Sequence, residues 1–255
     1  MSKNDNYADI AFRYNIARPL NRKDTEYWMT FISKKIGHRK NIKLLDLGCG
    51  NGRFAILFAQ KLGYKIIGTD NSPAMLEQAK QNDNGGIITW DLQDATHLDY
   101  LDNSFDAVWI SHLLHLVDDP QSVVNECYRV LKSQGILINR YASLEDNLQK
   151  PERKFFPELA QLDTARIPRQ KDVEKWFYNA GFLKINIEHL VVPTFKTGKE
   201  RYYRACQRAE SGLVKISDKN FKQGLMIFKK YIEKHRNNPW ILNEVYTIIT
   251  AVKDA

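Results

Sequence analysis

The stretch LLDLGCGNGRFA, from Leu44 to Ala55, constrains the fold more than any other part of the 255-residue chain. Glycines occupy alternate positions, Gly48, Gly50 and Gly52, between an apolar run and a second run rich in apolar residues. A buried strand, a tight turn and a helix account for this order. Glycine in such a turn lets the backbone approach a ligand where a Cβ would collide.

The alternation of strand and helix patterns continues beyond this stretch. Strands are predicted at 42–48, 64–70, 85–91, 104–111, 135–141, 183–192 and 240–253. Helices are predicted at 23–37, 53–63, 72–81, 119–132, 169–182, 199–212 and 218–236. Ser72 with Pro73, and Asp119 with Pro120, supply strong helix starts. Strands separated by helices predict a parallel α/β sheet with right-handed crossovers.

An acid follows the glycine loop at the distance a nucleoside cofactor requires. Asp70 lies 20 residues after Gly50, at the end of the next predicted strand. In an open parallel sheet, ligands bind beyond the carboxyl ends of the strands, where a carboxylate can accept hydrogen bonds from a ribose diol. The dinucleotide pattern G-x-G-x-x-G, started at Gly48, would need a glycine where this chain has Arg53. A nucleoside-containing cofactor other than a dinucleotide is therefore favoured.

The cysteines and the N-terminus restrict the class of protein further. Cys49, Cys127 and Cys206 are scattered without metal-ligand spacing, so no metal site is expected, and their odd number does not suit a secreted disulfide framework. The sequence MSKNDNYADI lacks the apolar core of a signal peptide, and no apolar run reaches 18 residues. We expect a soluble, cytoplasmic protein without a membrane span.

The net charge of +8 lies entirely in the second half of the chain. Residues 1–139 hold 16 Lys/Arg and 16 Asp/Glu, whereas residues 140–255 hold 22 and 14. This asymmetry is typical either of a surface for an anionic partner or of a solvated lysine-rich helical face. Charge alone does not distinguish the two.

Four stretches follow one another in the order and spacing of known family motifs: LLDLGCGNGRF, GTDNSPAMLEQAK, DLQDATHLDYLDNSFDAVWIS and VVNECYRVLKSQGILI. They resemble the class I S-adenosylmethionine-dependent methyltransferases, in particular the ubiquinone/menaquinone-biosynthesis-like (type 11) subfamily. The resemblance implies a Rossmann-like, doubly wound, seven-stranded, mostly parallel sheet. It also implies S-adenosyl-L-methionine as cofactor and S-adenosyl-L-homocysteine as product. It says little about the substrate, because the subfamily methylates very different molecules.

With that cofactor, we predict a single methyltransferase domain over residues 1–255. The cofactor-binding core covers 42–141, and helical additions at 1–38, 142–170 and 196–238 form a lid over the substrate region.

The resemblance also assigns roles to residues of the cofactor site. Asp46, Gly48 and Gly50 match the loop that holds the methionine part, with Cys49 between the glycines as a small loop residue. Asp70 matches the ribose-binding acid.

Further matches concern the adenine and the cofactor's carboxylate end. Asn71 follows the ribose acid, and Met75 packs nearby by helical spacing. Asp94 is expected to meet the adenine amine and Ala95 to line the ring, with Asp91 as the alternative acid. Three residues are expected at the methionine end: Ser111 near the sulfonium, and Tyr14 and Arg18 closing over the carboxylate.

The segment SHLLHL after the fourth predicted strand holds the candidate general base. Methyl transfer is an in-line displacement that chiefly needs alignment, and the acceptor decides whether a base is required. His112 is nearer the expected acceptor side, whereas packing or loop support is the favoured interpretation for His115. If the segment is helical, the two histidines share one face.

The same segment lacks the Asn/Asp-Pro-Pro-aromatic motif of many amino-directed methyltransferases. O- or C-methylation of a small acceptor, an acidic or aromatic metabolite, is therefore the leading hypothesis. One alternative is a tRNA/RNA nucleoside methyltransferase whose basic second half follows phosphates, although no RNA-binding module is appended. The other is an S-adenosylmethionine-binding protein without catalysis. The oligomeric state stays open.

Overall fold

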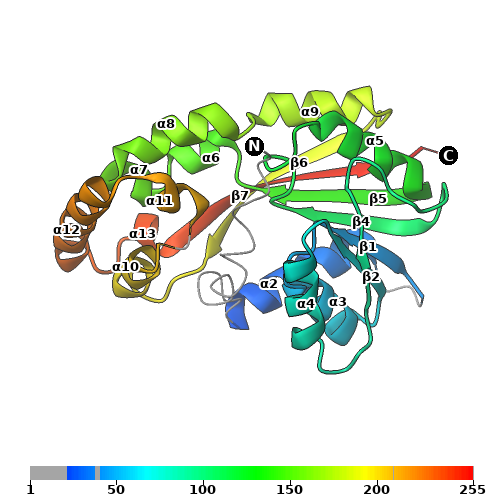
Figure 1. Ribbon diagram of the computed structural model, residues 1–255, viewed down its shortest axis with the longest axis horizontal. Coiled ribbons are helices and arrows are strands. Elements are labelled where there is room, and N and C mark those ends of the chain that lie inside the picture. The colour runs from blue at the N-terminus through cyan, green and yellow to red at the C-terminus, as the bar shows by residue number, and fades with distance from the viewer. Residues whose placement is uncertain (1–21, 38–40, 209, 255) are drawn as a thin grey trace.

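The computed structural model consists of a helix-flanked sheet and a cluster of helices that extends from one end of the sheet (Figure 1). It describes residues 22–37, 41–208 and 210–254.

The sheet contains seven strands in the order β3-β2-β1-β4-β5-β7-β6. The strands are β1 (Lys43–Leu47), β2 (Lys65–Asp70), β3 (Thr89–Leu92), β4 (Phe105–Ser111), β5 (Leu131–Tyr141), β6 (Ile185–Pro193) and β7 (Asn243–Val252). β7 runs antiparallel to both of its neighbours, and the other pairs are parallel. The predicted seven-stranded, mostly parallel, Rossmann-like sheet is confirmed.

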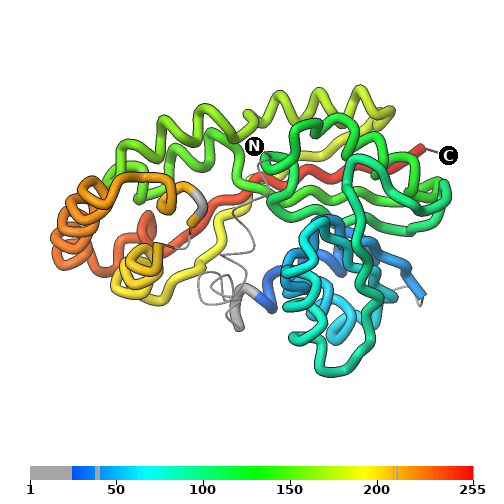
Figure 2. Tube along the Cα trace, viewed as in Figure 1, coloured from blue at the N-terminus to red at the C-terminus, as the bar shows by residue number. Residues whose placement is uncertain are grey.

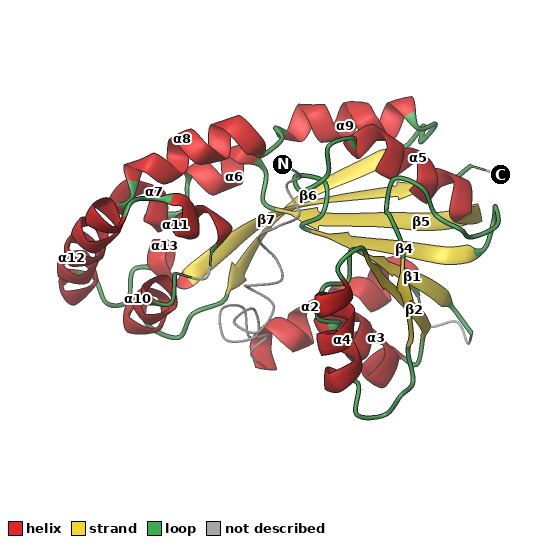
Figure 3. Cartoon of the chain, in the orientation of Figure 1, coloured by secondary structure: helices red, strands yellow, loops and turns green. Residues whose placement is uncertain are grey.

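Helices cover both faces of the sheet (Figure 3). One face carries α2 (Arg22–Ile36), α3 (Arg53–Leu62) and α4 (Pro73–Asn82), and the other carries α5 (Pro120–Val130) and α9 (Gln170–Asn179). Each face has its own hydrophobic core cluster, with Trp28 buried on the first and Phe177 on the second. The expected helix starts are present, because the side chains of Ser72 and Asp119 accept hydrogen bonds from N–H groups in the first turns of α4 and α5.

The remaining helices form a helical lobe around the ends of β6 and β7, as the chain trace in Figure 2 shows. They are α6 (Leu144–Leu148), α7 (Pro151–Phe155), α8 (Pro157–Arg166), α10 (Gly198–Cys206), α11 (Ser211–Lys215), α12 (Asp218–Lys234) and α13 (Pro239–Leu242). This lobe has a third core cluster, in which the rings of Phe155 and Phe228 stack with centroids 4.6 Å apart. The single-domain assignment stays a prediction.

Several element boundaries differ from the sequence prediction: β3 begins four residues later than expected, at Thr89, and β5 four residues earlier, at Leu131. The helix expected over 199–212 is divided into α10 and α11, because Arg208 takes a left-handed φ of 49° that interrupts helical geometry. The strand expected over 240–253 begins only at Asn243. Residues before it form α13, with Asn238 as N-cap and Pro239 in the first turn.

Candidate active site

The three glycines of the loop have positive φ angles, but they serve different purposes. A Cβ added to Gly48 would lie 2.9 Å from a methyl group of Leu113, and one added to Gly52 would lie 2.4 Å from the Trp90 ring. Within the described part of the chain, a Cβ at Gly50 would meet no atom within 4 Å. Gly50 therefore borders open space, whereas the protein's own side chains pack against the other two glycines.

Asp70 ties the glycine loop to the start of α4. Its two carboxylate oxygens accept hydrogen bonds from the N–H groups of Gly50, at 2.8 Å, and Ser72, at 2.9 Å. A carboxylate offers about four acceptor positions, so lone pairs remain for a ribose diol. Burial raises the pKa of Asp70, and the hydrogen bonds from these backbone groups oppose that rise.

Asp46 is a buried acid beneath the same loop, at 2% exposure on β1. Burial raises its pKa to about 7, against the opposing effects of the Ala55 N–H group and the charge of Arg53. Among the described residues, its Oδ2 atom has no hydrogen-bond partner. A buried acceptor without a partner is costly, and a cationic or N–H-bearing ligand group would satisfy it. Burial also raises the pKa of the neighbouring Cys49 thiol, which keeps it protonated and unreactive.

The candidate adenine residues lie past the end of β3. Leu92 pairs in the sheet with Asp70, the candidate for binding the ribose, and Asp94 comes two residues after Leu92. Asp94 is exposed, and its Oδ1 atom accepts bonds from the N–H and hydroxyl groups of Thr96, both at 2.8 Å. Asp91, the alternative acid, accepts a 2.7 Å hydrogen bond from the Tyr100 hydroxyl. Asp94 is the more exposed of the two acids, which favours it as the one accessible to a ligand.

The other predicted cofactor residues occupy different environments. Ala95 and Met75 are buried, at 8% and 3% exposure, whereas Asn71 is exposed beside the ribose candidate. Tyr14 and Arg18 lie outside the described residues.

At the end of β4, Ser111 is held by a residue of β5. Its Oγ atom accepts a 3.0 Å hydrogen bond from the guanidinium of Arg140, its partner in the strand register. Arg140 is buried, with its guanidinium carbon 3.8 Å from the ring centroid of Tyr246 and 4.6 Å from that of Trp28. These contacts fix the position of the strand end.

The segment SHLLHL is not the helix on which its two histidines would share one face. His112 takes a left-handed φ of 59°, while its N–H group donates to the carbonyl of Arg140 as a continuation of the sheet. Residues 112–118 then form bends and a turn closed by a hydrogen bond from Leu116 N–H to the Leu113 carbonyl. The rings of His112 and His115 nevertheless lie edge to face, with centroids 6.2 Å apart.

Tyr246 on β7 was not identified from the sequence. Its ring centroid lies 5.9 Å from that of His112 and 5.7 Å from that of Trp28. Its position among apolar and β-branched residues gives no local signal of a site. Only the insertion of β7 beside β5 brings it opposite the end of β4.

The sequence of the core matches a known family. Residues 45–139 match the family model described as a methyltransferase domain. Over 128 residues the chain is 38% identical to the ubiquinone/menaquinone biosynthesis C-methyltransferase UbiE of Desulfotalea psychrophila, covering 49% of this chain and 52% of that protein. The chain spans about half the length of the curated relatives it matches.

Two solved structures share the fold over most of this chain. One, from Anabaena variabilis, is described as a methyltransferase of an antibiotic biosynthesis pathway; its TM-score is 0.72 at 17% identity, over 89% of this chain and 96% of that one. The other is phosphoethanolamine N-methyltransferase 2 of Haemonchus contortus, with a TM-score of 0.63 at 20% identity, over 97% of this chain and 58% of that one.

Residues 45–139 thus form the core of a class I S-adenosylmethionine-dependent methyltransferase fold. The relatives that match include ubiquinone/menaquinone-biosynthesis methyltransferases, the subfamily that the sequence motifs resemble. None of the helices in the described ranges has the length and hydrophobicity of a membrane span. The described side chains form no group of three or more His, Cys, Asp or Glu suited to a metal ion.

Proposed function

We propose that this protein transfers a methyl group from S-adenosylmethionine to a small-molecule acceptor by O- or C-methylation. The observation that carries the proposal is the glycine loop, where Gly50 borders open space beside the carboxylates of Asp46 and Asp70. Asp70 would bind the ribose hydroxyls, and Asp46 would lie under the methionine part. Asp94 and Ala95 would contact the adenine. When bound, the cofactor supplies an electrophilic methyl group on a positively charged sulfur.

The acceptor would approach the end of β4. Ser111 is oriented there by Arg140, and His112 presents its ring between those of His115 and Tyr246. For an acceptor hydroxyl, the His112 imidazole is the proposed proton acceptor. The surrounding aromatic rings would exclude water and align the acceptor for in-line displacement.

Burial of several basic side chains supports a small acceptor over RNA. Arg140, Arg153 and Arg201, all in the basic second half of the chain, are at most 6% exposed. Arg153 and Arg201 form internal ion pairs, with Asp163 and Glu152 respectively. These cations therefore do not contribute to a surface that follows a phosphate backbone. A cytoplasmic location is part of the same proposal.

Calorimetric titration tests the cofactor assignment directly. Wild-type protein and an Asp70→Ala variant would be titrated with S-adenosylmethionine and S-adenosylhomocysteine. A Glu77→Ala variant, which alters an exposed acid on α4, serves as control. We expect micromolar binding by wild type and control, and its loss in Asp70→Ala, because the variant lacks both the ribose acceptor and the acceptor for the Gly50 N–H group. No binding by folded wild type would contradict the proposal.

A further inference from the structure

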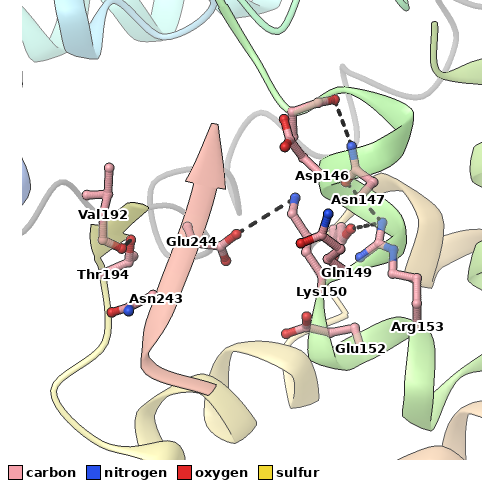
Figure 4. Close-up of polar contacts among 12 residues, drawn as sticks. Asp146, Asn147, Gln149, Lys150, Glu152, Arg153, Val192, Thr194, Asn243 and Glu244 are labelled. Atoms are coloured by element: carbon pink, nitrogen blue, oxygen red, sulfur yellow. Dashed lines mark hydrogen bonds and ion pairs between the residues drawn. The ribbon is translucent and has the colours of Figure 1, made fainter. Parts of the chain in front are cut away.

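A section of β7 leaves one of its edges outside the sheet. β5 ends at Tyr141, which pairs with Thr247, so residues 243–246 have only β6 as a strand neighbour. The junction of α6 and α7 lies along the open side. Figure 4 shows Lys150 extending from this junction toward Glu244 on β7.

Charged groups gather at this place in unequal numbers. Arg201 is fully buried and bonds both oxygens of Glu152 at 2.7 Å, so that these two charges balance. Glu244 is 3% exposed and receives a 2.5 Å hydrogen bond from Arg204, with the Lys150 ammonium 3.8 Å away. Arg201 also lies 3.4 Å from Glu244, so three cations face the two carboxylates. Glu210, whose charge also acts on Glu244, is paired with Arg153, which leaves a surplus positive charge here.

The ionisation of Glu244 keeps this arrangement in place. Burial raises the pKa of Glu244, but the charges of Arg201, Lys150 and Arg204 outweigh it and hold the pKa to about 2. The carboxylate is thus charged at every physiological pH, and it anchors the two cations.

Lys150 and Arg204 have unused hydrogen-bond donors. The Lys150 side chain is 15% exposed, and within the described ranges its only polar contact is the one with Glu244. An ammonium has three N–H donors and a guanidinium has five. Arg204, whose side chain is 29% exposed, uses one of its N–H groups on Glu244. Partly buried cations of this kind are stabilised when oxygen atoms complete their hydrogen bonds.

The two cations lie at a useful distance from the proposed transfer point. Glu244 and Tyr246 are two residues apart on β7 and share one face, so their Cα atoms are separated by roughly 6.5 to 7 Å. The Tyr246 ring in turn lies 5.9 Å from the His112 ring. A compact molecule can therefore bring one end to the cations and the other to the end of β4.

We infer that Lys150 and Arg204 bind an oxyanion of the methyl acceptor, a carboxylate or a phosphate monoester, and so select acidic acceptors. The inference rests on the proposed function, since it places the acceptor on that site. Glu244 orients both cations, and the surplus charge is neutralised when the acceptor binds.

Calorimetric titrations of the protein saturated with S-adenosylhomocysteine would test this. The probes are 4-hydroxybenzoate, phenyl phosphate and the neutral 4-hydroxybenzamide, each added to wild type and to Lys150→Gln. Lys199→Gln, which changes an exposed lysine of α10, is the control. Because Gln keeps a hydrogen-bonding side chain, the variant is expected to fold, and its melting temperature would verify this.

We expect wild type and Lys199→Gln to bind at least one of the two acids about tenfold more tightly than the amide. Lys150→Gln should lose most of that preference, and whichever acid binds more tightly identifies the oxyanion. Equal binding of acids and amide, binding of none of them, or a preference retained in Lys150→Gln would overturn the inference. Binding of S-adenosylhomocysteine is measured separately, and its failure would count against the proposed function instead.

Discussion

Gly50→Ala should mainly weaken ligand binding, whereas Gly52→Ala should mainly lower the stability of the fold. Both residues have left-handed backbones, with φ of 56° and 78°, which cost an alanine about 1 to 2 kcal/mol. A Cβ at Gly50 enters open space, so Gly50→Ala should lose no more stability than this backbone cost. The same Cβ would occupy the space expected to hold the cofactor, so the affinity for S-adenosylhomocysteine should fall at least about tenfold.

Gly52→Ala adds a collision to the backbone cost. The Trp90 ring would lie 2.4 Å from the new Cβ, and the same ring approaches a Cβ built at Gly68 to 2.5 Å, so it is confined on both sides. Overpacking of this kind costs about 1 to 3 kcal/mol. The free energy of unfolding should therefore fall by roughly 2 to 5 kcal/mol in total.

Urea denaturation and calorimetry would separate the two effects. Gly63→Ala is the matched control. Gly63 also has a left-handed φ, of 66°, and no atom of the described residues lies within 4 Å of its added Cβ. It lies at the far end of α3, away from the glycine loop. Gly63→Ala should lose only the backbone cost of about 1 to 2 kcal/mol in stability and keep its affinity for S-adenosylhomocysteine. If Gly50→Ala binds like wild type, or if Gly52→Ala is as stable as Gly63→Ala, the reasoning is wrong.

Three further predictions concern charged groups. Because the pKa of Asp46 is raised from 3.8 to about 7, the folded ligand-free state holds an extra proton between these values. The free energy of unfolding of the protein should therefore fall by up to roughly 4 kcal/mol as pH rises through this window. The affinity for the cofactor should rise over the same window. Asp46→Asn should flatten the pH dependence of stability, measured by denaturation, and that of affinity, measured by calorimetry. Glu152→Gln should destabilise the protein by about 3 to 5 kcal/mol in urea, since it leaves buried Arg201 without a full counter-charge, while the exposed Glu77→Gln should change little. His112→Asn introduces a residue that tolerates the left-handed φ of this position. If His112 is the base, kcat should fall at least about a hundredfold while the affinity for S-adenosylhomocysteine stays the same. An unchanged kcat would assign His112 to packing.

Local patterns were sufficient for much of this molecule. The strand ending at Asp70 and the N-cap at Ser72 depend on interactions between near neighbours in the chain, such as the bond from Ser72 N–H to the Asp70 carboxylate. Sequence reasoning therefore located the strands and the glycine loop between β1 and α3. It was less successful where helices end, as at Arg208. An arginine gives no sequence signal for the left-handed φ that this residue adopts.

By itself, the sequence determined the parallel α/β architecture and the loop with its ribose candidate, since apolar periodicity and glycine positions act over short distances. Only the tertiary structure decided which glycine borders open space, because Trp90 and Leu113 reach the loop from separate elements. It also placed Tyr246 beside His112, and Lys150 and Arg204 around Glu244. These contacts join residues far apart in the chain, and they arise because β7 inserts between β5 and β6 and carries one end of the site with it.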